Sequence, residues 1–312
     1  MKLLLPAPIR PLLAAALPPE LEVTWWSDAA SARAGIADAQ VAWVDMHDKA
    51  AMADTLRAAG PGLRWVSTIY AGLDTLPLDL LRDRGVTVTN GAGVNAAAVA
   101  DYAVLGLLAA AKRYDQVVRA QDRREWLREA PGTVEPAGTR ALVIGYGTIG
   151  RMIGERLAAF GVAVTGVTRS GRDGTLGPDD WRAKLGEVDW VILAAPSTGD
   201  TRAMIGAAEL AAMKRTAWLV NIARGDMIDD DALVAALREG RVGGAFLDPS
   251  HPEPLPADHP LWAAPNCLLS MHLSGRSQTS MYPRAAALFL ENLAAWRANR
   301  PMRNVADLSA GY

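Results

Sequence analysis

A glycine-rich turn between two apolar runs constrains the fold of this chain more than any other feature. The run 141–144 leads into Gly145, Gly147 and Gly150, and a helical stretch and a second run, 162–167, follow. Strand, turn, helix and strand in this order form a βαβ unit with parallel strands. The first glycine allows the turn, the second lets the backbone approach a pyrophosphate, and the third lets the helix pack closely on the strand.

This arrangement predicts a dinucleotide-binding site. Glycines also form ordinary tight turns, but here the helix that follows offers unpaired N–H groups and a partial positive charge to phosphates. The predicted phosphate-binding residues are Gly145, Gly147, Thr148, Ile149 and Gly150.

Short apolar runs alternate with helical stretches through most of the remaining sequence. Strands are expected at 2–5, 41–44, 65–69 and 86–89, and later at 190–194, 218–222, 244–247 and 268–271. Helices are expected at 49–59, 77–84, 96–111, 113–129 and 284–297. Alternation of this kind is typical of βαβ units. The predicted class is therefore an α/β fold with two Rossmann-like or flavodoxin-like domains, each with a parallel sheet.

The break at 90–93 and the Ser/Gly turn after His272 divide the chain. The last helix is too short to form a domain, so we expect it to pack back on the first block. The predicted organisation is a dinucleotide-binding domain, 94–275, inserted into a discontinuous substrate domain, 1–93 and 276–312, with hinges near Gly93 and Gly275.

Composition narrows the class of protein. At 312 residues, of which 50% are hydrophobic and 21% charged, the chain is long enough for two globular domains. Its formal charge of −2 argues against nucleic acid or an acidic membrane surface as a partner. The single cysteine, Cys267, excludes an internal disulfide and a cysteine-rich metal site. No metal is predicted, and a cytoplasmic location is expected.

Two apolar segments have some features of membrane signals. The N-terminal segment is interrupted by Pro6, Pro8 and Pro11, which favours a buried strand over a signal peptide. The run 96–111 is shorter than the roughly 20 residues that span a bilayer and contains Asp101. We therefore expect a buried core helix there and no membrane partner.

The end of the run 162–167 distinguishes between the two nicotinamide cofactors. NAD-binding proteins usually place an acid about 20 residues after the glycine motif to bind the ribose 2′-hydroxyl. Here the sequence continues as Thr168-Arg169-Ser170-Gly171-Arg172, with no acid before Asp173. Arginine and hydroxyl side chains bind a 2′-phosphate well. NADP(H) is therefore the predicted cofactor and NAD(H) the alternative; the other interpretation is that Arg169 and Arg172 are solvated loop cations.

Three polar residues follow predicted strands in the last third of the chain: Arg224, Glu253 and His272. Because ligands of open parallel sheets bind beyond the carboxyl ends of the strands, we expect the three to lie near one edge. An imidazole exchanges protons near neutral pH. A carboxylate on its other nitrogen fixes the tautomer and favours the protonated ring, and a guanidinium binds a carboxylate or carbonyl oxygen of the substrate. Together they predict a reaction centre.

These motifs resemble the D-isomer-specific 2-hydroxyacid dehydrogenases over nearly the whole chain. The resemblance rests on GYGTIG (145–150), NIARG (221–225), the stretch from LD to EPLP (247–256) and HLSG (272–275). The Thr-Arg-Ser loop is most similar to the glyoxylate/hydroxypyruvate reductase branch, which uses NADPH. Pro249 and Met271 depart from the family's usual Val and Pro. These departures concern the local backbone and remove no functional group.

The resemblance implies NADPH-dependent reduction of a small 2-oxo acid to the D-2-hydroxy acid. It implies that His272 is the proton donor, that Glu253 is its partner, and that Arg224 clamps the substrate. It implies further cofactor contacts at Ala195, Pro196, Ile222, Ala223, Arg224, Asp248, His272 and Gly275, and a substrate carboxylate loop at Tyr70, Ala71 and Gly72. Trp43 is expected either to line the substrate pocket or to belong to the core. A homodimer built through the inserted domain is also implied, with the charged stretch 113–129 either in the interface or solvated.

Three alternative functions fit the same scaffold. A formate dehydrogenase needs no proton relay, and Glu253 argues against it. A non-catalytic, corepressor-like dinucleotide sensor would not need the acid–base pair that this chain keeps. A dehydrogenase for a different 2-hydroxy acid is the third alternative, because the sequence does not identify the physiological substrate.

Overall fold

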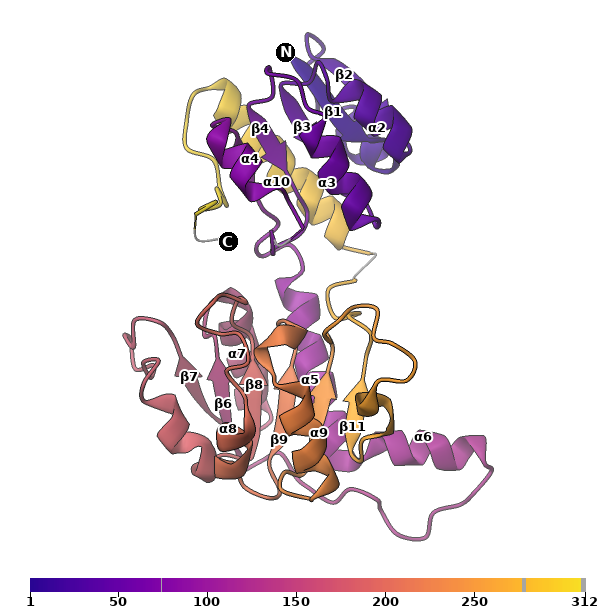
Figure 1. The fold of residues 1–312 in the computed structure, drawn as a ribbon, viewed down its shortest axis with the longest axis vertical. Helices are drawn as coiled ribbons and strands as arrows, with labels where there is room; N and C mark the ends of the chain where they lie inside the picture. Colours follow the sequence, from indigo (N-terminus) through magenta and orange to yellow (C-terminus); the bar gives the residue numbers. More distant parts are fainter. Residues whose placement is uncertain (74, 277–278, 310–312) are drawn as a thin grey trace. The chain divides into compact units, whose positions relative to one another are not determined.

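The computed structural model describes residues 1–73, 75–276 and 279–309, which fall into two compact α/β units (Figure 1). The first unit comprises Met1–Asn95 and Ser277–Tyr312, and the second comprises Ala96–Arg276. Every strand pairing within the two sheets is parallel. The predicted α/β class with two parallel sheets is therefore confirmed.

The first unit contains a five-stranded sheet in the order β2-β1-β3-β4-β5. Its strands are β1 (Lys2–Pro6), β2 (Glu22–Trp26), β3 (Val41–Trp43), β4 (Trp65–Ser67) and β5 (Thr87–Thr89). Its helices are α1 (Arg10–Leu13), α2 (Ala29–Gly35), α3 (Lys49–Arg57), α4 (Leu78–Asp83) and α10 (Met281–Arg297), with a 3-10 turn, η1 (Ala7–Ile9).

Helix α10 belongs to the first unit because its apolar side chains pack on one face of that sheet. Phe289 is 1% exposed and stacks on Trp65, with the ring centroids 5.2 Å apart. The ring of Trp43 also packs on Phe289, with the centroids 5.4 Å apart. The opposite face is covered by α2 and α3, whose core side chains include Ala32 and Met52. The prediction that the last helix packs on the first block is confirmed.

The second unit contains a six-stranded sheet in the order β11-β10-β9-β8-β6-β7. Its strands are β6 (Arg140–Ile144), β7 (Ala163–Val167), β8 (Trp190–Leu193), β9 (Trp218–Asn221), β10 (Gly244–Leu247) and β11 (Cys267–Leu269). Its helices are α5 (Ala96–Lys112), α6 (Tyr114–Asp122), α7 (Thr148–Ala159), α8 (Ala207–Ala212) and α9 (Asp230–Arg238), with 3-10 turns η2 (Trp181–Glu187), η3 (Gly225–Met227) and η4 (Pro260–Ala263).

Both faces of the six-stranded sheet are buried under helices. Successive side chains of a strand point to opposite faces, so neighbouring residues pack in different layers. Ala141 and Val143 of β6 pack with α5 and α7, whereas Leu142 and Ile144 pack with η2, α8 and α9. Among the described helices, none is long and apolar enough to cross a membrane. The prediction of a buried core helix at 96–111 is confirmed, since nine residues of α5 are buried.

The structure contains elements that were not predicted, among them β2, and one predicted helix is too long. Strand β2 was not predicted, because it is an edge strand whose side chains are mostly partly exposed and whose sequence lacks a clear apolar run. The charged stretch 113–129 is helical only over α6. Arg124 takes a left-handed φ of 58°, which ends the helix. Charged residues have adequate helix propensity, but only Ala120 of α6 is buried, so packing does not extend the helix.

Candidate active site

The glycine turn after β6 forms an open cradle at the start of α7. Gly145 has a φ of 98°, and a Cβ atom there would lie 2.3 Å from the backbone nitrogen of Ala195. A Cβ on Gly150 would lie 2.2 Å from the carbonyl oxygen of Gly145, whereas nothing lies within 4 Å of a Cβ on Gly147. Gly147 is the N-cap of α7, and no side chain caps that end. The cradle therefore fits a pyrophosphate, which would bind the helix N–H groups.

The ring of Tyr146 fills the space beside this turn. A Cβ on Gly154 of α7 would lie 2.3 Å from the Tyr146 hydroxyl oxygen, and a Cβ on Gly166 of β7 would lie 2.3 Å from its Cγ. The guanidinium of Arg151 lies 5.5 Å from the ring centroid. Two glycines on different elements therefore make room for one aromatic side chain inside the motif.

The predicted cofactor-selecting loop follows β7. The Thr168 hydroxyl lies 2.7 Å from the Thr175 hydroxyl and accepts a hydrogen bond from the Gly171 N–H at 3.1 Å. These bonds close the loop on itself, so Thr168 shapes it. Arg169, Ser170 and Arg172 are exposed, and the loop therefore presents two guanidinium groups and a hydroxyl to solvent.

Asn221, the last residue of β9, shapes the turn that positions Arg224. It is fully buried, donates from Nδ2 to the Arg224 carbonyl oxygen at 2.7 Å, and accepts from the Ala223 N–H at 3.0 Å. The Arg224 side chain is half-buried and donates to the Ala223 carbonyl oxygen at 2.8 Å. Ile222 and Ala223 have buried side chains. In the sequence analysis Asn221 appeared only as part of the NIARG motif and was given no role. A polar residue at the end of an apolar strand was the feature that could have indicated this role.

The loop after β8 reaches the same turn. Ser197, which follows the predicted cofactor residues Ala195 and Pro196, donates its hydroxyl to Asp226 at 2.8 Å. Because Asp226 lies two residues beyond Arg224, this bond joins the Ala195–Pro196 segment to the Arg224 turn.

Asp248, at the end of β10, organises the loop that contains His272. It is 1% exposed, and its Oδ1 accepts from the Ser270 hydroxyl at 2.7 Å and the Leu273 N–H at 2.8 Å. Its Oδ2 accepts from the Ser274 N–H at 3.1 Å, and its carbonyl oxygen accepts from the His272 N–H at 2.7 Å. These bonds hold the left-handed backbone of Met271 and His272, whose φ values are 57° and 55°.

Glu253 and His272 form a direct pair. The Nδ1 of His272 lies 2.8 Å from Oε2 and 3.1 Å from Oε1 of Glu253, and Oε1 also accepts from the Ser250 N–H at 3.1 Å. Burial raises the pKa of Glu253, but the hydrogen bond and charge of His272, the Ser250 N–H and the charge of Arg224 outweigh it. The net result is a pKa below its ordinary value. Glu253 is therefore ionised at neutral pH, and Nε2 is the His272 nitrogen that does not face it.

The predicted substrate loop lies in the first unit, after β4. The backbone of Tyr70 accepts a hydrogen bond from the Gly91 N–H at 2.9 Å, and the Ala71 carbonyl oxygen accepts one from Asn90 at 3.1 Å. Trp43 is 2% exposed, and its indole N–H donates to Asp45 at 2.7 Å. The burial of Trp43 favours its interpretation as a core residue. The sequence did not single out Asp45.

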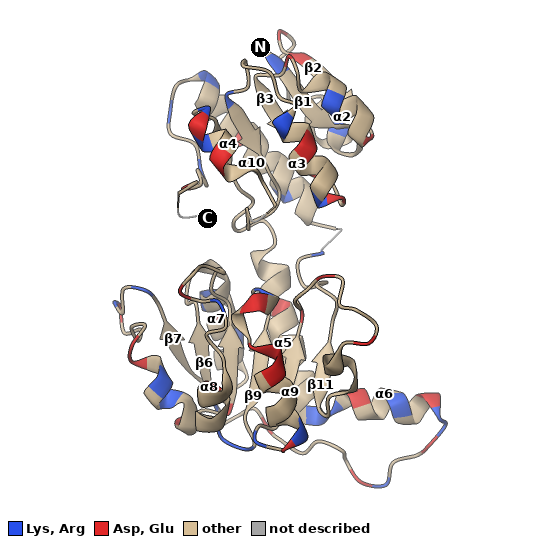
Figure 2. Ribbon diagram, in the orientation of Figure 1, with Lys and Arg blue, Asp and Glu red and all other residues tan. Residues whose placement is uncertain are grey.

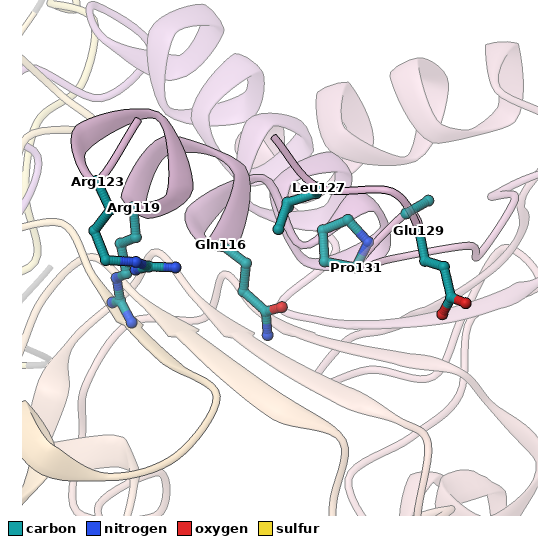
Figure 3. A pocket seen from close by; sticks show the side chains of 7 residues that line it. Gln116, Arg119, Arg123, Leu127, Glu129 and Pro131 are labelled. Carbon is teal, nitrogen blue, oxygen red and sulfur yellow. The ribbon is translucent and has the colours of Figure 1, made fainter. Parts of the chain in front are cut away.

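Other clusters lie outside this site. Within the described part of the chain, no group of three or more His, Cys, Asp or Glu side chains is arranged to hold a metal ion. Burial raises the pKa of the Cys267 thiol to about 12, so the thiol is unreactive. A hollow lies between α6 and the segment after it (Figure 3), and it is lined by Gln116, Arg119, Arg123, Leu127, Glu129, Ala130 and Pro131.

The chain is similar to known proteins over most of its length. A family model described as "D-isomer specific 2-hydroxyacid dehydrogenase, NAD binding domain" matches residues 104–274. A glyoxylate reductase of Aeropyrum pernix is 33% identical over 264 residues, covering 81% of this chain and 78% of the relative. A solved D-isomer specific 2-hydroxyacid dehydrogenase family protein from Aeromonas salmonicida has a TM-score of 0.88 at 29% identity, with 98% and 99% of the two chains covered. The NADPH-dependent glyoxylate/hydroxypyruvate reductase of Sinorhizobium meliloti, solved with NADP and malonate, has a TM-score of 0.80 at 28% identity, with 99% and 98% covered.

Proposed function

The chain belongs to the D-isomer specific 2-hydroxyacid dehydrogenase family and is an NAD(P)-dependent oxidoreductase, and we propose that it reduces a small 2-oxo acid of the glyoxylate or hydroxypyruvate type to the D-2-hydroxy acid. The observation that carries this proposal is the 2.8 Å contact between His272 Nδ1 and Glu253 Oε2 in the unit that contains the glycine cradle. The substrates named for the relatives from Aeropyrum and Sinorhizobium support the choice of substrate class.

In this proposal the chain's own residues bind the substrate and deliver a proton. When bound, the reduced nicotinamide cofactor supplies the hydride. Arg224 binds the carboxylate or carbonyl oxygen of the substrate through charge-assisted hydrogen bonds. His272 donates a proton from Nε2 to the carbonyl oxygen, since its Nδ1 faces Glu253. Glu253 fixes the orientation of the ring and stabilises its positive charge before the proton leaves.

The cofactor that we propose is NADP(H), with NAD(H) as a weaker second. The exposed guanidinium groups of Arg169 and Arg172 and the Ser170 hydroxyl offer the charge and the donors that a ribose 2′-phosphate needs. No acidic residue lies between Thr168 and Arg172 to repel that phosphate. The backbone of Tyr70, Ala71 and Gly72 is proposed to bind the substrate carboxylate.

We propose that the protein is a homodimer built through α6 and the segment that follows it, up to residue 138. Figure 1 shows this segment projecting from the six-stranded sheet of the second unit, and Figure 2 shows both signs of charge along α6. Trp126 is 92% exposed and Tyr114 58% exposed. Large apolar side chains at such exposure are typical of an interface. The mixed charges and the hollow of Figure 3 are suited to a second copy of the same segment.

A spectrophotometric assay at the absorbance band of the reduced cofactor tests the reaction. Purified protein with NADPH should oxidise the cofactor when glyoxylate or hydroxypyruvate is added, and a panel of 2-oxo acids graded by chain length ranks the substrates. The His272→Ala variant should turn over roughly 10²–10⁴-fold more slowly. His251→Ala, an exposed histidine in the loop after β10, serves as the control. Absence of turnover with any short 2-oxo acid and either cofactor would favour the non-catalytic sensor.

A further inference from the structure

One carboxylate joins two segments at the carboxyl end of the first unit's sheet. Asp45 lies just after β3 and is partly buried. Its Oδ2 accepts the indole N–H of Trp43 at 2.7 Å and the backbone N–H of Ile69 at 2.6 Å. Its Oδ1 accepts the hydroxyl of Thr68 at 2.6 Å. Both oxygens are therefore bonded, and the end of β3 is joined to the chain that leaves β4.

The connection continues into the proposed substrate loop through Thr68. Because the Thr68 hydroxyl gives its hydrogen to Asp45, its oxygen is free to accept the backbone N–H of Tyr70, at 3.2 Å. Helix α3 and the residues before it contact the Tyr70 side chain. The Tyr70 hydroxyl donates to the Met46 carbonyl oxygen at 3.2 Å, and the Lys49 ammonium lies 3.2 Å from the centroid of the Tyr70 ring. Tyr70 is therefore held through both its backbone and its ring.

The negative charge of the Asp45 carboxylate is unfavourable where it lies, because the group is withdrawn from water. Burial raises the pKa of Asp45, and its three hydrogen bonds together with the charge of Lys49 offset this only in part, so that the pKa stays above its ordinary value. A neutral residue would form the core of the first unit at lower cost, since burying a charge is unfavourable unless it is fully compensated. The network is therefore better explained by what it orients than by stability alone.

We propose that Asp45 is a positioning residue for the substrate loop: through Thr68 and Ile69 it fixes the backbone of Tyr70–Gly72 in the conformation that binds the substrate carboxylate. The proposal rests on the function proposed above, because it assumes that this loop meets a 2-oxo acid. The Lys49 ammonium over Tyr70 partly balances the Asp45 charge, so that an anionic substrate is not repelled.

Three variants test the proposal. Thr68→Val removes the hydroxyl that links Asp45 to Tyr70, and Asp45→Ala removes the acceptor. Asp45→Asn is the conservative variant, because an asparagine can accept from Trp43 and Ile69 with its oxygen and donate to Thr68 with its amide. Thr55→Val is the matched control: Thr55 is equally buried in the first unit, and its hydroxyl donates within α3, to Ala51 at 2.8 Å.

Steady-state kinetics should separate positioning from general damage. Thr68→Val and Asp45→Ala should raise KM for the 2-oxo acid by about tenfold, the scale of one lost charge-assisted hydrogen bond. The KM for the nicotinamide cofactor should not change, and kcat should change less than the substrate KM. Asp45→Asn should lie between wild type and Asp45→Ala, and Thr55→Val should match wild type. A wild-type substrate KM in Thr68→Val, or an equal rise in Thr55→Val, overturns the proposal.

Hydrogen exchange of the amides at residues 69–72 provides a second measurement that needs no turnover. Exchange should be faster in Thr68→Val and Asp45→Ala than in wild type and Thr55→Val. If wild type reduces no 2-oxo acid, the proposed function fails. Separately, unchanged exchange in Thr68→Val would refute the positioning of the loop by Asp45 and Thr68. If Asp45→Ala does not fold, Thr68→Val carries the same test.

Discussion

A Cβ atom on Gly225 would lie 2.1 Å from the carbonyl carbon of Ser250, so the turn that contains Arg224 rests directly on the backbone of the loop that contains Glu253. Only a residue without a side chain allows two backbones to approach so closely. Because Ser250 also donates its N–H to Glu253, and Glu253 faces His272, one backbone contact and two hydrogen bonds connect all three members of the proposed reaction centre.

Gly225→Ala should therefore disturb chemistry as well as stability. The added methyl group meets backbone atoms that cannot rotate away, and overpacking of this kind costs about 1–3 kcal/mol. We expect the catalytic efficiency to fall by roughly tenfold or more, because Arg224 and Glu253 move apart. Gly62→Ala is the control, since its Cβ would meet only the Ala39 carbonyl oxygen, at 4.0 Å. Equal kinetics and equal melting temperatures for the two variants would contradict the role of the contact.

Asp248→Asn should weaken the His272 loop. An asparagine keeps one acceptor but points an amide N–H₂ at a backbone N–H of Leu273 or Ser274, and a buried unsatisfied donor costs about 1–3 kcal/mol. We expect a lower melting temperature and a kcat lowered by roughly tenfold. Asp231→Asn, an exposed position in the first turn of α9, should match wild type in both. A wild-type kcat for Asp248→Asn would show that the loop does not depend on this carboxylate.

Glu253→Gln should change the pH dependence of both stability and rate. Since the pKa of Glu253 is lowered on folding from its ordinary 4.5, its stabilising effect is complete above pH 4.5 and is lost as the pH falls through the lowered pKa. The difference in melting temperature between wild type and Glu253→Gln should therefore vanish in strong acid. In reduction assays at neutral pH the variant should be less active than wild type, because Glu253 is ionised there and a glutamine supplies no charge to the His272 ring. This difference in rate should shrink as the pH falls through the lowered pKa of Glu253. Superimposable pH profiles would exclude the relay.

Arg169→Asp should exchange the cofactor preference. An aspartate at this position repels a 2′-phosphate and can bond a ribose 2′-hydroxyl. The ratio of catalytic efficiencies, NADPH over NADH, should fall by roughly 100-fold. Arg215→Asp makes the same charge change on an exposed residue that precedes β9, whereas Arg169 follows β7. Because the strands are parallel, Arg215 lies at the other edge of the sheet, and its substitution should leave the ratio unaltered. A clear NADH preference in the wild-type protein would refute the NADP(H) assignment.

Light scattering after size exclusion should give a mass twice the 33.1 kDa of one chain. Trp126→Ser should weaken the dimer by roughly 30-fold or more, the scale of a central interface tryptophan. Phe160→Ser removes an aromatic that is 45% exposed at the end of α7 and should leave the dimer intact. A monomeric wild-type protein, or equal dissociation constants for the two variants, would count against the interface.

The elements that could be predicted from the sequence are those with a local signal. Apolar runs of four or five residues mark buried parallel strands, and the glycine spacing marks the turn after β6, so the fold and the neighbourhood of each strand end followed directly. The pairing of Glu253 with His272 was expected because both follow predicted strands of one parallel sheet and because the family resemblance implies it. The structure adds that the two strands are neighbours and that the contact distance is 2.8 Å.

The contacts without a local signal could not be predicted. Asp45 meets Thr68 and Ile69, which lie 23 and 24 residues further along the chain, and no pattern marks these partners. Asp248 was expected at the cofactor, but its side-chain bonds to Ser270, Leu273 and Ser274 depend on how the loop after β11 returns over β10. Helix α6 was predicted too long. Helix propensity alone favours a longer helix in this charged stretch, but only Ala120 is buried, so packing does not stabilise the extra turns.

The ring of Tyr146 has a consequence for anyone who redesigns the phosphate-binding turn. The ring occupies the space that side chains at Gly154 and Gly166 would fill, so the sizes of the residues at these three positions depend on one another. A smaller residue at 146 leaves a void that a methyl group on α7 or β7 can refill, whereas a methyl group added first has no room. The order in which such substitutions are introduced therefore decides whether every intermediate protein on the path still folds.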